Sequence, residues 1–320
     1  MSLAFHPNNP AWLAAGNFNG EIFLWDLSVD DDPLIGGCGM GHSDSHREPV
    51  AKLQWILDPQ SRGKSYKLVS VSGDGKILMW NFDQQLKQLT LAEGFLVIAQ
   101  NLPKSLRGKG SRLTREVGLT CFSCSHYEDN SFLVGSESGT IFKCSRDSSS
   151  ILIPADDEKG CSVPLMAPIT LSYKPHIGPI NAIDYSSFHQ QAFLSVGMDE
   201  SIRIWNALET QPIKVLEPGQ GPVLCGAWSP VRPMVIAVTT EKGQLLLYDL
   251  KCSYALPLHA LQASKKNAPV FVCSFNKQCT HLLATGDGLG YVHIFHLDDD
   301  LSHQDPREVE QFVSLVSTSE

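Results

Sequence analysis

The sequence predicts an all-β protein of the β-propeller class, assembled from a repeated blade. Six segments of the 320-residue chain end an apolar, alternating run on an aromatic residue, and a second alternating run follows each of them. Within a unit the runs flank short polar turns, as in KLVSVSGDGKILMW, which is the pattern of a β-hairpin. No window of comparable length shows the 3.6-residue period of a helix. A strand-only repeat of about 40–45 residues favours a propeller over a sandwich or a barrel.

The repeat is regular enough to be counted. The first runs end at Phe5, Trp55, Phe122, Tyr185, Trp228 and Phe275, and the second runs end at Trp25, Trp80, Cys144, Trp205, Tyr248 and Phe295. The offset between partners is 20 residues in four units and 25 and 22 residues in the other two, where a loop insertion explains the excess. Residues 1–320 are therefore predicted to form one domain with six readable four-stranded blades.

Two units carry a set of four side chains at matching spacing, with a Ser ten residues and an Asp six residues before the Trp. The first tetrad is His46, Ser70, Asp74 and Trp80, and the second is His176, Ser195, Asp199 and Trp205. We expect each imidazole to bridge the turn carboxylate and the hydroxyl, while the indole N–H finds an acceptor. Such a network satisfies buried polar groups and locks a loop onto its hairpin. The Trp25-Asp26 pair and its variants Trp80-Asn81 and Trp205-Asn206 identify the repeat as a WD repeat.

A Ser, a His and an Asp together also suggest a hydrolase. A nucleophilic serine is expected on a strained turn in a G-x-S-x-G context, whereas Ser70 and Ser195 fall in the middle of predicted strands. The glycine-rich segments 36–41 and 286–290 lack the strand-to-helix context of a phosphate-binding loop. We therefore predict no catalytic site and no cofactor.

Two groups of residues have spacings that invite a metal ion. Cys121 and Cys124 form a single CxxC with His126 as a third ligand, whereas a closed zinc site takes four ligands. The second group is Cys38, His42, Asp44 and His46, and the first tetrad already requires His46. We predict no metal site in either group and expect the CxxC thiols to be reduced and buried at the end of a strand.

Composition excludes two classes of partner. The net charge of -9 and the pI near 5.6 oppose nucleic-acid binding, which needs a concentrated positive surface. The mean hydropathy of -0.08 and the lack of an apolar run of about 18–20 residues oppose a membrane span. The first residues, MSLAFHPNNP, show no signal peptide, so an intracellular protein is expected.

Three stretches between the predicted blades are long, at 29–48, 83–116 and 145–175. The second contains five basic residues within twelve positions and no acidic residue among them: Lys104, Arg107, Lys109, Arg112 and Arg115. This basic segment is predicted to be either a solvated loop or a docking site for an acidic partner surface. Near the end of the chain, Phe312 to Val316 is expected to supply a final outer strand.

Several segments resemble the dynein intermediate chains. They include HPNNPAWLAAGNFNGEIFLWDL, GPINAIDYSSFHQQAFLSVGMDESIRIW and, most specifically, WSPVRPMVIAV followed by LLLYDL. LAEGFLVIAQNLP and the ending HQDPREVE look closest to the intermediate chain of dynein-2, the motor of retrograde intraflagellar transport. In WSPVRP we expect Trp228 to be buried against the neighbouring blade. Arg232, in the turn that follows, is expected at the surface and is a candidate for partner contact.

The resemblance implies a seven-bladed WD40 propeller, of which we expect the first blade to lie outside the six readable here. It implies a non-catalytic subunit that docks on the dynein-2 heavy chain beside a second intermediate chain. It places the protein in the cytoplasm and cytoskeleton, at the ciliary axoneme and at the ciliary base or centrosome. Light-chain binding is not expected, because the resemblance does not extend to the upstream extension that recruits light chains in the family. The alternative is a generic WD-repeat scaffold or adaptor, such as a ubiquitin-ligase substrate receptor or a signalling adaptor, because a fold does not fix a function.

Overall fold

The computed structural model describes residues 2–39, 41–58, 61, 65–83, 85, 87–107, 112–147, 150–155 and 160–317. These residues form six β-sheets in two compact units. The first unit comprises Met1–Cys124, Asp129–Glu137 and Phe142–Ser172, and the second comprises Ser125–Glu128, Ser138–Ile141 and Tyr173–Glu320. Each unit is described by itself.

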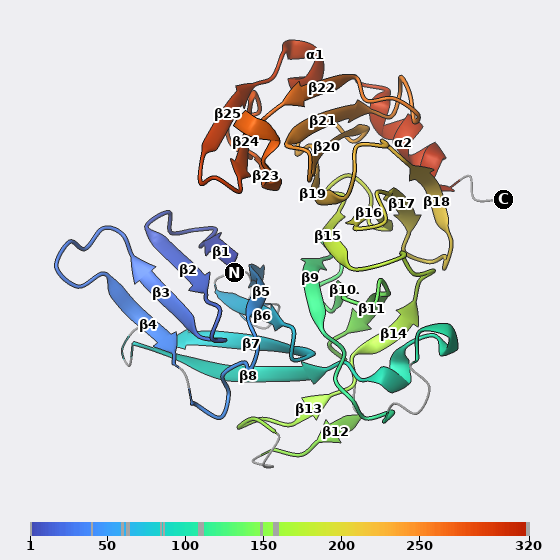
Figure 1. Cartoon of the computed structure of the whole chain (residues 1–320). Coiled ribbons are helices and arrows are strands. Elements are labelled where there is room, and N and C mark those ends of the chain that lie inside the picture. The colour runs from blue at the N-terminus through green and yellow to red at the C-terminus, as the bar shows by residue number, and fades with distance from the viewer. Residues whose placement is uncertain are drawn as a thin grey trace. The chain divides into compact units, whose positions relative to one another are not determined.

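The first unit holds three blades of antiparallel strands (Figure 1). The first blade is a meander of β1 (Ser2–Phe5), β2 (Trp12–Gly16), β3 (Ile22–Asp26) and β4 (Leu34–Cys38). The second repeats this order with β5 (Val50–Leu57), β6 (Tyr66–Ser72), β7 (Lys76–Asp83) and β8 (Gln88–Leu96). Two short 3-10 helices follow, η2 (Ala99–Asn101) and η3 (Lys104–Leu106). The third is built from β9 (Leu119–Cys124), β10 (Ser131–Ser136), β11 (Ile141–Ser145) and β14 (Ile169–Ser172).

The stretch 145–175, one of the three long stretches between the predicted blades, contains an additional hairpin. Its strands β12 (Ile151–Ile153) and β13 (Leu165–Met166) extend the second blade, and β13 runs parallel to β8. Leu165 is fully buried beside Gly94, where an added Cβ would lie 2.7 Å from the leucine side chain. The lack of a side chain at Gly94 therefore admits this insertion, which shows no strand alternation of its own.

The second unit also holds three sheets. One consists of β15 (Ile180–Tyr185), β16 (Ala192–Gly197), β17 (Ile202–Asn206) and β18 (Pro212–Leu216). The next consists of β19 (Val223–Trp228), β20 (Val235–Thr240), β21 (Gln244–Asp249) and β22 (His259–Gln262), after which comes η4 (Lys265–Asn267). The last has three strands in the part of the chain that is described, β23 (Val270–Phe275), β24 (Leu282–Asp287) and β25 (Val292–His296). The prediction of four strands was wrong for this blade within those residues.

The chain continues after β25 into two helices, α1 (Asp299–Ser302) and α2 (Glu308–Ser317). The prediction of an outer strand at Phe312 to Val316 was wrong, because these residues lie in α2. Phe312 and Val316 are four positions apart, so they share one face of the helix, and both are fully buried. The acidic residues Glu308 and Glu310 occupy the first turn, where they suit the helix dipole.

The counted repeat corresponds to real strands. The aromatic residues that end the first runs lie on β1, β5, β9, β15, β19 and β23, and the second runs end on the third strand of each sheet. Five of the six first-run aromatics are buried, whereas Phe5 is exposed. The all-β propeller class with six blades is thereby confirmed, and the count of seven stays a prediction. No helix among the described residues is long and apolar enough to cross a membrane.

The turn between the second and third strands has the same backbone conformation in every blade. A residue with positive φ stands five positions before the end of each second run. Glycine fills this place in five blades, and Glu200 (φ 63°) fills it in the sixth. The glycines are Gly20, Gly75, Gly139, Gly243 and Gly290. Only glycine adopts this conformation without steric cost, which explains its recurrence.

Candidate functional site

The first tetrad assembles in the second blade. The Nε2 atom of His46 lies 2.7 Å from the Oγ atom of Ser70, and its Nδ1 atom lies 3.2 Å from a carboxylate oxygen of Asp74. The indole N–H of Trp80 donates to the same hydroxyl at 2.8 Å. The side chains of His46, Ser70 and Trp80 are almost completely buried. The four residues therefore form one chain of hydrogen bonds from β7 through β6 to the loop that precedes β5.

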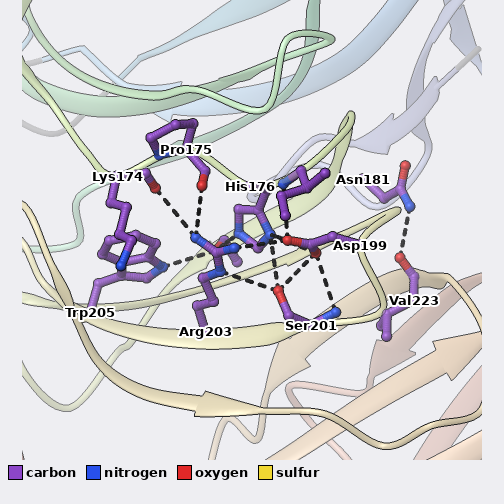
Figure 2. Close-up of polar contacts among 11 residues, drawn as sticks. Lys174, Pro175, His176, Asn181, Asp199, Ser201, Arg203, Trp205 and Val223 are labelled. Atoms are coloured by element: carbon purple, nitrogen blue, oxygen red, sulfur yellow. Dashed lines mark hydrogen bonds and ion pairs between the residues drawn. The ribbon is translucent and has the colours of Figure 1, made fainter. Parts of the chain in front are cut away.

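The second tetrad has the same geometry. His176 Nε2 lies 2.7 Å from Ser195 Oγ, and His176 Nδ1 lies 2.9 Å from Asp199 Oδ1. Trp205 donates to Ser195 Oγ at 2.9 Å. Figure 2 shows the imidazole of His176 pointing at the carboxylate of Asp199. The backbone N–H of Ile177 also donates to this carboxylate, which fixes the loop before β15 to the β16–β17 turn.

The direction of the hydrogen bonds implies a neutral imidazole. If the indole donates to the serine hydroxyl, the hydroxyl can donate to Nε2, and Nδ1–H can donate to the carboxylate. Burial lowers the pKa of His176, and the nearby Arg203 charge adds to this effect, while the bond to Asp199 opposes it. Burial would raise the pKa of Asp199, but its bonds to His176 and Ser201 outweigh burial and hold the pKa below its usual value. The pKa of Asp74 is lowered in the same way by His46 against the effect of burial.

Two residues that the sequence analysis missed enlarge the second tetrad. Ser201 donates from its hydroxyl to Asp199 at 2.7 Å, and Arg203 donates to the other carboxylate oxygen at 2.8 Å (Figure 2). Arg203 also donates to the backbone carbonyl of Pro175 at 3.0 Å. The alternation in SIRIW contained a signal for them, because Ser201 and Arg203 fall on the same strand face as Trp205.

The tetrads are unsuited to nucleophilic catalysis. Both serine side chains are fully buried beneath an indole whose N–H already points at the hydroxyl. A nucleophile needs access to its substrate and a set of donors for the developing oxyanion. The positions of Ser70 and Ser195 therefore support a structural role.

Asp44 and Cys124, two of the residues considered as metal ligands, are poorly placed to bind a metal ion. Asp44 accepts hydrogen bonds from the backbone N–H and the hydroxyl of Ser162, at 2.6 and 2.7 Å. All nine cysteines are free thiols, and burial raises the pKa of Cys124 to about 12. A thiol that resists deprotonation is a poor metal ligand.

In WSPVRP, Trp228 is buried as expected. Its indole N–H donates to the backbone carbonyl of Asp184 on β15 at 3.2 Å, and its own backbone N–H bonds to the Asp184 carboxylate at 2.8 Å. The ring also meets Phe312 of α2 edge-on, with centroids 5.4 Å apart. Trp228 therefore joins its own blade to the preceding one and to the C-terminal helix.

Arg232 is buried, so the expectation of a surface position was wrong. Its guanidinium donates to both carboxylate oxygens of Glu308 at 2.9–3.2 Å, to Asp249 at 2.9 Å and to the backbone carbonyl of Asp300. Burial would lower the pKa of Arg232, but the bonds and charges of Glu308 and Asp249 outweigh burial and raise it. The turn between two prolines thus directs the guanidinium inward, onto the segment that begins α2.

The basic segment is anchored at its base. Backbone N–H groups of Ala99 and Gln100 donate to the carbonyls of Arg115 and Leu113 at 2.8 and 2.9 Å. Arg107 donates back to the carbonyls of Leu102 and Gln100. The side chains of Lys104, Arg112 and Arg115 are exposed, and Lys109 lies outside the described residues. Three of the five charges are therefore free to meet a partner, whereas Arg107 has a local structural role.

The stability of the protein is expected to fall as the pH falls from about 7.5 to 5.5. In the unfolded chain His176 titrates near its usual pKa of 6.5, whereas the folded state holds that pKa lower. The unfolded state therefore binds more protons below about pH 6.5, and the free energy of unfolding declines. Burial also lowers the pKa of His6, His126 and His189, so these residues change the free energy of unfolding in the same direction as the pH falls.

Urea denaturation at constant ionic strength across this range measures the effect. A free energy of unfolding that stays flat or rises towards pH 5.5 would contradict the neutral, buried imidazole.

Comparison with known proteins agrees with the repeat. The family model described as "WD domain, G-beta repeat" matches residues 168–206, which include the second tetrad. The chain is 35% identical to cytoplasmic dynein 2 intermediate chain 2 of Mus musculus over 316 residues, covering 98% of this chain and 58% of the relative. For the protein of the same name in Homo sapiens the identity is 35% over 318 residues, covering 99% and 58%.

More distant similarity extends to the cytoplasmic dynein 1 intermediate chain of Drosophila melanogaster. The identity is 24% over 323 residues, covering 99% of this chain and 43% of the relative. The chain therefore spans less than two thirds of the length of these relatives. The resemblance expected from the sequence motifs is confirmed: this chain of β-propeller blades, with a WD repeat at residues 168–206, is similar over nearly its whole length to the dynein intermediate chains.

Proposed function

We propose that the protein is a non-catalytic intermediate chain of the dynein-2 motor, whose blades dock on the dynein heavy chain during retrograde intraflagellar transport. The observation that carries this proposal is the 35% identity to dynein-2 intermediate chains across 98–99% of the chain. The proposed partners are the heavy chain and a second intermediate chain. The proposed location is the cytoskeleton and the cilium, including the axoneme and the ciliary base.

The internal contacts suit a rigid docking platform. The tetrads join strands and loops within single blades, and Arg232 joins a blade to α2. This bond also brings together two of the segments that carry the resemblance, since Arg232 belongs to WSPVRP and Glu308 to HQDPREVE. A protein that uses its blades as a fixed surface needs such stabilised loops, because binding residues sit on loops held by a rigid scaffold.

Affinity purification from ciliated cells tests the proposal. The tagged chain is expected to recover the dynein-2 heavy chain. Arg232→Ala should release α2, and the recovery of the heavy chain by this variant is compared with that by the parent. Recovery of ubiquitin-ligase or kinase components without the heavy chain would support the alternative of a generic WD-repeat scaffold.

Reversing the exposed charges of the basic segment is expected to slow association with an acidic heavy-chain surface. The variant replaces Lys104, Arg112 and Arg115 with Glu and leaves Arg107 in place, because its guanidinium bonds to the loop backbone. The effect should be largest at low salt, because screening lengths shorten to about 8 Å at physiological ionic strength.

Association rates across a salt series measure this effect. The control reverses three exposed lysines on other segments: Lys52, Lys242 and Lys277. Equal rates for the two triple variants at every salt concentration would show that the basic segment is a solvated loop.

A further inference from the structure

Three imidazoles and a carboxylate lie close together at the end of the last blade, where the chain passes into α1. His281 directly precedes β24, His296 ends β25, Asp299 begins α1 and His303 follows it. Potential ligand atoms of His281, Asp299 and His303 all lie within 4.8 Å of one another. None of these residues belongs to a tetrad or to the Arg232 network.

The rings are held in defined orientations. The His281 ring is parallel to the His296 ring within 10°, with centroids 5.4 Å apart, and its centroid lies 5.3 Å from that of His303. His281 Nδ1 lies 3.4 Å from the carbonyl oxygen of Leu297. An imidazole that binds a metal commonly donates its other N–H to a backbone carbonyl, which fixes the tautomer. This contact would leave Nε2 of His281 available as a ligand.

We propose that His281, Asp299 and His303 form a binding site for a zinc ion. Two imidazole nitrogens and one carboxylate oxygen are a ligand set that zinc accepts, and the fourth tetrahedral position stays open for water. Calcium and magnesium prefer sites made of oxygen ligands alone, so this set discriminates against them.

Small side-chain movements complete the geometry. Tetrahedral ligands with bonds near 2.0 Å lie roughly 3.3 Å apart, so the group must contract from its present spacing. His303 Nδ1 lies 3.7 Å from Asp299 Oδ1 and 3.3 Å from the backbone carbonyl oxygen of Asp299, a contact that it would exchange for the ion. The side chains of His303 and Asp299 are 67% and 87% exposed. Exposed side chains change rotamer at little cost, whereas His281 is half-buried and can stay in place.

A bound ion would link the start of β24 to both ends of α1. These segments are separated by β25 in the sequence, so the ion would fasten the three-stranded blade to the chain that leads into α2. A ligand that binds only the folded state stabilises it in proportion to its concentration over its dissociation constant. Zinc is therefore expected to raise the melting temperature of the protein.

Calorimetric titration of the chelator-treated chain with zinc chloride tests the site. We expect one saturable site, weakened at least about tenfold by His281→Ala and by His303→Ala. His259→Ala removes an exposed imidazole from β22 and is the matched control, which should bind zinc like the parent. Cobalt(II) in place of zinc should give the visible absorption bands of a tetrahedral nitrogen and oxygen site, and magnesium should not bind.

His303→Gln is a second variant that should fold like the parent, because residue 303 is exposed and lies outside every sheet among the described residues. Its melting temperature without metal should match that of the parent, and zinc should no longer raise it. Zinc affinity that is unchanged in both His281→Ala and His303→Ala would overturn the assignment, as would the lack of a saturable site in the parent.

Discussion

Replacing Arg232 with Ala is expected to lower the free energy of unfolding by about 3–5 kcal/mol. The guanidinium bonds to Glu308 and Asp249, and the side chains of all three residues are at most 7% exposed. The substitution would leave two carboxylates buried without their cation, and an uncompensated buried charge costs more than the ion pair contributed. The loss should also release α2, because Glu308 is in its first turn.

Urea denaturation of the Arg232→Ala protein measures this loss, and Lys251→Ala is the matched control. Lys251 forms an ion pair at 2.8 Å with Asp305, which lies just before α2, but both side chains are about 40% exposed. Exposed ion pairs contribute little, so the control should unfold like the parent. The free energy of unfolding of Glu308→Gln should lie between those of Arg232→Ala and the parent, because an amide oxygen still accepts from the guanidinium. An Arg232→Ala protein as stable as the parent would mean that the buried network is not formed.

The buried position of Arg232 shows which contacts can be predicted from a sequence and which cannot. The tetrads were predictable because three of their four residues lie within ten positions of one another on a single hairpin. Glu308 is 76 residues from Arg232 in the chain, and no periodic pattern connects the two. A turn between prolines therefore suggested an exposed arginine, although the distant segment covers it.

The same distinction explains the other differences. The strands of the repeat follow from alternation within each hairpin, which is a local signal. The pairing of β13 with β8 depends on the space above Gly94 in another blade. The run from Phe312 to Val316 is too short for its hydrophobic period to distinguish a strand from a helix. The structure forms a helix there, with Phe312 in contact with Trp228.

Replacing Asp199 with Ala is expected to lower the free energy of unfolding by about 3–5 kcal/mol, more than His176→Ala at about 1–3 kcal/mol. The Asp199 carboxylate accepts from His176, Ser201 and Arg203, and the Arg203 side chain is only 10% exposed. Removal of the carboxylate would therefore leave a buried cation unpaired as well as an unsatisfied imidazole.

The first tetrad is the internal control for the effect of the Arg203 cation. Its Asp74 meets His46, but Leu78 occupies the position that Arg203 holds in the second blade. Asp74→Ala should accordingly cost only about 1–3 kcal/mol, the cost of unsatisfied hydrogen bonds. Chemical denaturation of both variants against the parent gives the two losses, and equal losses would show that Arg203 adds nothing to the second network.

A double-mutant cycle isolates the contribution of the arginine. Arg203→Leu gives this position the residue that the first blade has there, Leu78, while Ser201 keeps its bond to Asp199. In that background the Asp199→Ala loss should shrink towards that of Asp74→Ala. Residues that share one network show coupling energies of about 0.5–3 kcal/mol. A loss from Asp199→Ala that is the same with Arg203 or Leu at this position would mean that the cation is satisfied without the carboxylate, by Ser201 and the carbonyls of Lys174 and Pro175. The tetrad would then stabilise both blades through the same four residues, with no added charge effect in the second.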